Sequence, residues 1–213
     1  MPSSSIEFLL NDELVTINDI NTNTTVLEYL RNYKNLKGTK EGCASGDCGA
    51  CTAVIAELKN NKLKYKSINT CITLLYSLHS KQLLTVEYIE SKYLHPVQQS
   101  MVDNDGAQCG FCTPGFIMSM YAMHKNKISP TDSNINRYLS GNLCRCTGYR
   151  PIKEALKNLK KYKDLESDTS KVFKKLKKIK LSDVVLNRYG SKFYIHQNLK
   201  NFKKDFIKSK SPS

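Results

Sequence analysis

The sequence lacks the features of a membrane or secreted protein. No stretch approaches the roughly 18 consecutive apolar residues that a membrane span needs. The first residues, MPSSSIEFLLNDE, have neither a basic flank nor a long apolar run, so they do not form a secretory signal. We therefore expect a soluble, cytoplasmic protein without a membrane partner. In that reducing compartment disulfides are rare, and clustered cysteines more commonly bind metal.

A nucleic-acid partner is also poorly supported, although the net charge is +14. Residues 1–156 contain 16 Lys+Arg and 14 Asp+Glu, whereas residues 157–213 contain 17 and 5. The positive charge therefore belongs to the end of the chain rather than to a folded basic surface. Lysine-rich tails are typically solvated, so we predict a linker there and no nucleic-acid partner.

The eight cysteines restrict the possible functions of the chain more than any other feature of the sequence. Cys43, Cys48 and Cys51 have the spacing C-x4-C-x2-C, and Cys71 follows after 19 residues, which is the plant-type spacing for a 2Fe–2S cluster. Glycines within this loop let it curl and direct backbone N–H groups at the sulfurs. The alternative is a structural zinc site, but such sites usually combine two short C-x2–4-C pairs.

The other four cysteines form two close pairs, with 31 residues between the pairs. Cys109 and Cys112 lie in QCGFCTPG, and Cys144 and Cys146 lie in LCRCTGYR. Four thiols on two tight turns suit a second metal centre. Arg145, between two of them, either reduces the negative charge of the site or forms a surface salt bridge.

The turn around Cys109 is predicted to lead directly into a helix. Gly110 lets the backbone pass close to whatever the sulfurs hold. Thr113 is expected to cap the helix, with Pro114 at its first position.

The N-terminal third is predicted to be a small mixed sheet around a short helix. The expected elements are a hairpin over Ile6–Ile17 that turns at Asn11-Asp12, a helix over Thr24–Asn32 and a loop over Leu36–Cys51. A second hairpin of strands over Thr52–Leu58 and Lys62–Ile68 is expected to turn at Asn60-Asn61, and a helical turn over Cys71–Leu78 and a strand over Leu83–Tyr88 follow.

The next segment is predicted to be all-α, because apolar residues recur at three- and four-residue spacing. The expected helices are Val97–Asp103, Pro114–Lys125, Asp132–Leu139 and Ile152–Tyr162. The four histidines form no ligand pattern, and His95 is expected to start the first of these helices. We predict an α+β chain with a sheet domain over residues 1–90, a four-helix domain over 91–165, each with its own core, and a basic tail over 166–213.

Three motifs resemble the iron–sulfur region of the molybdenum hydroxylases, and in particular its xanthine dehydrogenase branch. They are EGCASGDCGAC at 41–51, HPVQQSMVDNDGAQCGFCTPGF at 95–116 and GNLCRCTGYRPI at 141–152. The resemblance covers roughly residues 5–165. It implies a β-grasp, ferredoxin-like 2Fe–2S domain followed by a four-helix 2Fe–2S-binding domain.

The resemblance also implies residue roles. Cys43, Cys48, Cys51 and Cys71 would ligate an outer cluster that faces a flavin. The inner cluster, beside a molybdopterin cofactor, would take Cys109, Cys112, Cys144 and Cys146. Gln108 matches the glutamine whose amide contacts the pterin, since an amide offers donors and an acceptor without charge.

By this resemblance the chain would be an electron-transfer subunit and not a complete enzyme. Its partners would be a molybdopterin-binding large subunit, which hydroxylates a purine or similar heterocycle, and an FAD-binding domain or subunit. Lys192–Ile207 resembles the first strand and helix of such an FAD domain, but no glycine-rich phosphate loop follows, so we expect no FAD binding by this chain. The alternatives are the small subunit of a related aldehyde or carbon monoxide dehydrogenase, and a zinc-stabilised binding module with a basic tail.

Overall fold

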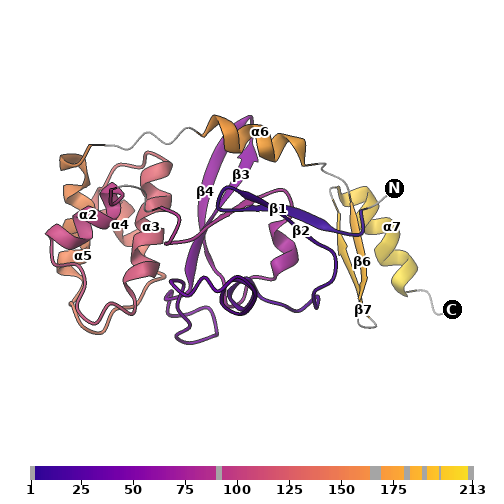
Figure 1. The fold of residues 1–213 in the computed structure, drawn as a ribbon, viewed down its shortest axis with the longest axis horizontal. Coiled ribbons are helices and arrows are strands. Elements are labelled where there is room, and N and C mark those ends of the chain that lie inside the picture. The colour runs from indigo at the N-terminus through magenta and orange to yellow at the C-terminus, as the bar shows by residue number, and fades with distance from the viewer. Residues whose placement is uncertain are drawn as a thin grey trace.

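The N-terminal part of the protein is a five-stranded mixed sheet. The computed structural model describes residues 3–89, 93–163, 169–179, 183–188, 191–196 and 198–210. The strands are β1 (Ile6–Leu10), β2 (Glu13–Ile17), β3 (Thr52–Lys59), β4 (Lys62–Asn69) and β5 (Gln82–Leu84). They lie in the order β2-β1-β5-β3-β4, with β1 parallel to β5 and every other neighbouring pair antiparallel (Figure 1).

Both predicted hairpins are confirmed, and asparagine explains their turns. Asn11 has a φ of 56°, and Asn60 and Asn61 have φ of 51° and 55°. Asparagine tolerates this left-handed conformation better than most residues, which is why it suits two-residue hairpin loops. The last strand is shorter than the predicted Leu83–Tyr88, because β5 ends at Leu84 and a turn follows.

One face of the sheet covers the predicted short helix, which forms as α1 (Val26–Glu28) and a π-helical turn η1 (Tyr29–Tyr33). The Thr25 side chain accepts a hydrogen bond from the Glu28 backbone N–H and caps it. A second short turn, η2 (Leu75–Leu78), follows Cys71. Residues from these turns and from the sheet form one hydrophobic cluster: Phe8, Ala53, Ile55, Val26, Leu30, Leu75 and Tyr76.

The segment over residues 93–163 is helical. Its helices are α2 (Pro96–Asp103), α3 (Thr113–Lys125), α4 (Asp132–Leu139), α5 (Arg150–Lys157) and a 3-10 turn η3 (Asn158–Lys161). His95 starts α2 as predicted, in a capping box with Gln98. The prediction for Thr113 is wrong: Cys112 occupies the N-cap position and Thr113 is the first helical residue.

The expected separate cores are also wrong, because the sheet and the helices share one. Val54 and Ala56 of β3 belong to the same hydrophobic cluster as Phe116 and Met120 of α3, whereas Ala53 and Ile55 face the other way. β3 is therefore buried on both faces, with the α2–α5 group on one side of the sheet (Figure 1). The predicted boundary at Glu90–Lys92 lies outside the described residues.

The lysine-rich tail is not a plain linker. Helix α6 (Ser170–Lys178) packs Val172 and Leu176 against Leu9 of the sheet, because its apolar residues recur on one face while its lysines point outward. Beyond it lie β6 (Val184–Arg188), β7 (Ser191–Ile195) and α7 (Leu199–Lys210), at the opposite end of the molecule from α2–α5 (Figure 1). Val184 of β6 extends the sheet's own core.

Helix α7 has an exposed apolar face. It consists of Leu199, Phe202, Phe206 and Ile207, which are 46–66% exposed. Across the described parts of the chain, no helix has the length and apolar character needed to cross a membrane.

Candidate metal centre

The first cysteine loop wraps around the sulfur of Cys43. Three backbone N–H groups, of Ser45, Asp47 and Cys48, each donate to this sulfur at 3.4 Å. The loop curls tightly enough for this because Gly46 has a φ of 85°, a conformation that side-chain-bearing residues rarely adopt. Backbone donors directed at a sulfur stabilise negative charge on it.

Hydrogen bonding and burial shift the pKa values of two cysteines of the first set in opposite directions. The hydrogen bonds from Ser45 and Cys48 lower the pKa of Cys43 to about 6. Burial raises the pKa of Cys71 to about 11, and its hydrogen bond with Cys51, with the two sulfurs 3.3 Å apart, acts in the same direction. The structure therefore brings Cys71 from after β4 to the loop that carries Cys43, Cys48 and Cys51.

The second cysteine set also comes together, from the α3 turn and from the loop before α5. The thiol of Cys109 is hydrogen-bonded with that of Cys146, and the thiol of Cys112 with that of Cys144. Burial, followed by the contact with Cys144, raises the pKa of Cys112 to about 12. Gly110 has a φ of 83°, with no atom within 4 Å of an added Cβ, so conformation rather than crowding by protein atoms requires glycine there.

Two residues that were not predicted brace this second set. The Thr147 hydroxyl lies 3.1 Å from the Cys144 sulfur, and the Thr147 N–H donates to that sulfur at 3.5 Å. The Tyr149 hydroxyl accepts the Cys144 backbone N–H at 3.0 Å, and its ring packs edge-on against Phe116. Both lie within the motif LCRCTGYR, but the spacing of the motif does not show which way their side chains turn.

Solvent reaches both sets. Cys43, Cys109 and Cys146 are exposed, and Cys51 is buried. Gln108 is exposed on the turn before Cys109. A cavity of about 300 Å³ lies beside Cys71 and includes the charged residues Arg31 and Glu41 in its wall.

The chemistry of these donors fits iron–sulfur clusters. Each set offers four cysteine sulfurs, all but Cys71 on glycine-containing loops, and peptide N–H groups point at sulfur in both. Among the described residues, no three His, Cys, Asp or Glu side chains converge in the way that would hold one metal ion.

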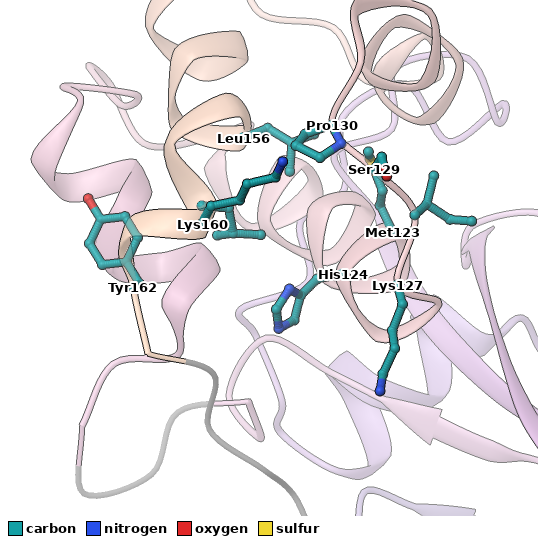
Figure 2. Close-up of a pocket in the computed structure, with 10 residues that line it drawn as sticks. Met123, His124, Lys127, Ser129, Pro130, Leu156, Lys160 and Tyr162 are labelled. Atoms are coloured by element: carbon teal, nitrogen blue, oxygen red, sulfur yellow. The ribbon is translucent and has the colours of Figure 1, made fainter.

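A separate concavity of about 290 Å³ lies between α3 and α5 (Figure 2). Its wall is largely apolar, with His124, Lys127 and Lys160 among the residues that line it. None of its lining residues is a cysteine, so it is not part of either cysteine set.

Comparison with known proteins supports this interpretation. Residues 8–76 match the family described as 2Fe-2S iron-sulfur cluster binding domain, and residues 85–157 match a second family described as 2Fe-2S binding domain. The chain is 46% identical over 157 residues to the xanthine dehydrogenase/oxidase of Mus musculus, which is 72% of this chain and 12% of the mouse protein. It is 43% identical over 159 residues to a probable aldehyde oxidase of Caenorhabditis elegans, which is 73% of this chain and 13% of that protein.

Solved structures agree. A chain of quinoline 2-oxidoreductase from Pseudomonas putida 86 superimposes with a TM-score of 0.62 at 29% identity, and the match covers 72% of this chain and 90% of that one. The aldehyde oxidoreductase of Desulfovibrio gigas gives a TM-score of 0.63 at 29% identity over 73% of this chain and 16% of its own. The chain therefore contains two 2Fe–2S-binding domains, and it is similar to part of xanthine dehydrogenase and aldehyde oxidase relatives. It spans only about an eighth of the curated relatives it matches.

Proposed function

We propose that this chain is the electron-transfer iron–sulfur portion of a xanthine dehydrogenase-type molybdenum hydroxylase. The observation that supports the proposal is that sulfurs meet within each predicted set, Cys51 with Cys71 in one and Cys109 with Cys146 in the other. Loops in both places point peptide N–H groups at sulfur. Cys43, Cys48, Cys51 and Cys71 would hold the outer 2Fe–2S cluster. The inner cluster would be held by Cys109, Cys112, Cys144 and Cys146.

The chain's own residues set how easily each site accepts an electron. A bound 2Fe–2S cluster supplies one-electron redox chemistry, which is the cofactor's own. The peptide N–H groups around Cys43 and the Thr147 contacts to Cys144 would stabilise the extra negative charge of a reduced cluster. They would therefore raise the reduction potential of that cluster. Arg145, exposed between Cys144 and Cys146, adds positive charge on the solvent side of the inner site.

The arrangement of the fold suits a role between two partners. We assign residues 1–90 to a β-grasp domain and α2–α5 to a four-helix domain. Gln108 is exposed beside Cys109, where its amide is available to a molybdopterin cofactor on a partner. An FAD-binding domain would receive electrons from the outer site, and the reduced thiols suit a cytoplasmic location.

A related aldehyde-oxidising enzyme is the second candidate. The nematode aldehyde oxidase and the mouse xanthine dehydrogenase match this chain almost equally, at 43% and 46% identity. In both candidate enzymes the substrate would bind to the partner and not to this chain. The two proposed functions therefore differ only in the identity of the partner.

Redox titration of the full chain tests the proposal. The reduced protein should show two paramagnetic signals, each from one electron, and the molybdopterin-binding partner with its substrate should reduce both. A chain that carries no reducible iron would refute the electron-transfer role. Reduction by an aldehyde but not by a purine would select the second candidate.

A further inference from the structure

The two cysteine loops are joined by a backbone hydrogen bond. The N–H of Leu143 donates to the carbonyl of Cys48 at 2.9 Å. Cys48 belongs to the first set, and Leu143 directly precedes Cys144 of the second. The covalent path from the Cys48 sulfur to the Cys144 sulfur is thus interrupted here by one hydrogen bond.

Glycines bring the backbones together at this point. A Cβ on Gly49 would lie 2.1 Å from the carbonyl oxygen of Gly141, and a Cβ on Gly115 would lie 2.2 Å from the carbonyl oxygen of Gly49. Such distances leave no room for a side chain. The first loop, helix α3 and the second loop therefore meet in direct backbone contact.

The side chain of Asn142 fills the junction and is only 4% exposed. Its amide nitrogen donates to the Gly49 carbonyl at 3.0 Å and lies 3.1 Å from the Thr52 hydroxyl oxygen. Its amide oxygen accepts the Ser119 hydroxyl at 2.6 Å, and the Thr52 hydroxyl in turn donates to Gly49 at 2.7 Å. This side chain links the first loop, β3 and α3 to the second loop.

An amide is well suited to this position. Asparagine supplies two donors and an acceptor on a short side chain, whereas aspartate supplies no donor when ionised and leucine supplies neither. Because the partners are buried, each would lose its hydrogen bond without access to water if the amide were removed.

We propose that Asn142 is a positioning residue for electron transfer between the two clusters. Its buried amide holds the Gly49 carbonyl, and with it the adjacent Cys48 carbonyl, against the second loop. The Leu143–Cys48 hydrogen bond is thereby kept short. Since electronic coupling falls steeply with separation, this contact sets how fast the two sites exchange an electron.

The step itself is simple, and the inference rests on the proposed function. Cys109, Cys112, Cys144 and Cys146 would hold the donor cluster, and Cys43, Cys48, Cys51 and Cys71 would hold the acceptor cluster. The donor would pass on one electron supplied by the reductant used in the experiment, so the donor would be oxidised by one electron and the acceptor reduced by one. No bond forms or breaks, and no proton is transferred.

The experiment compares variants of the full chain after loading with iron and sulfide. Asn142→Ala removes the amide, and Ser119→Ala removes only the hydroxyl that donates to the amide oxygen. The matched control is Asn136→Ala, because Asn136 is an exposed asparagine on α4. Two quantities are measured in proteins that retain both clusters. They are the rate of electron equilibration between the two clusters after rapid one-electron reduction, and the hydrogen exchange of the Leu143 amide by mass spectrometry.

Asn142→Ala should slow equilibration severalfold and raise Leu143 amide exchange by roughly 5- to 150-fold, the factor that corresponds to the loss of one buried hydrogen-bond partner. Ser119→Ala should shift both quantities less in the same direction, and Asn136→Ala should match wild type. Faster exchange with unchanged equilibration would overturn the proposal, because the contact would then be structural only. Loss of clusters in both junction variants would also overturn it, since the network would then serve assembly. The proposed function fails separately, if wild type itself holds no clusters or passes no electron between them.

Discussion

Replacing Gly49 with alanine should destabilise the protein far more than a surface substitution. Gly49 has a φ of 70°, and an added Cβ would lie 2.1 Å from the Gly141 carbonyl oxygen and 2.6 Å from the Asn142 amide nitrogen. To make room for this Cβ, the loop that carries Gly49 and the segment Gly141–Asn142 must separate.

The magnitude follows from two effects. A left-handed conformation costs alanine about 1–2 kcal/mol. Displacing the Gly141–Asn142 backbone breaks the buried hydrogen bond between Asn142 and Gly49, which costs roughly 1–3 kcal/mol. The sum of roughly 2–5 kcal/mol is a large part of the about 5–15 kcal/mol that typically stabilises a domain.

Gly148→Ala is a control that has the conformational cost of a left-handed alanine without the steric clash. Gly148 has a φ of 66°, close to that of Gly49, but no atom lies within 4 Å of an added Cβ. Urea unfolding of the metal-free full chain, followed by circular dichroism, should therefore show a loss of about 1–2 kcal/mol for Gly148→Ala and a clearly larger loss for Gly49→Ala. Equal losses would refute the close packing of the two loops.

Three further predictions concern single residues of the site. Cys48→Ser should abolish one of the two paramagnetic signals of the reduced protein and keep the other; loss of both with the fold retained would mean that the ligand sets are divided differently. Gln108→Ala should keep both signals but slow cluster reduction by the molybdenum partner, at a cost of roughly 1–3 kcal/mol; normal reduction rates with normal cofactor retention would remove Gln108 from the site. In the metal-free chain, iodoacetamide should alkylate Cys43 above pH 6 and lose reactivity as the pH falls through about 6, because only the thiolate reacts and its pKa is lowered to that value. Cys71, whose pKa is raised to about 11, should react slowly at pH 7, and equal rates at the two cysteines would contradict the assigned environments.

Local chemistry made much of the fold predictable. The hairpin turns at Asn11 and Asn60-Asn61 form as expected, because asparagine tolerates the positive φ they need. Helix α4 begins and ends where its apolar spacing places it, and the structure shows that the Thr131 side chain caps it. Short spacing likewise predicts which cysteines share a loop, because residues on one short loop must lie close in space. These are Cys43, Cys48 and Cys51, the pair Cys109 and Cys112, and the pair Cys144 and Cys146.

The remaining features depend on contacts between distant parts of the chain. Lysines dominate the composition of α6 and predict a solvated linker, yet Val172 and Leu176 bury one face against the sheet. The contacts of Asn142 could not be predicted either, for a different reason. Its partners Gly49 and Thr52 lie about 90 residues earlier, and only the tertiary fold brings them together.

Metal analysis tests the central claim most directly. Two complete sets of four cysteines predict two 2Fe–2S clusters, and hence about four iron and about four acid-labile sulfide per chain in anaerobically prepared protein. The protein should be brown and should contain little zinc. A colourless protein with stoichiometric zinc and little iron would contradict the account.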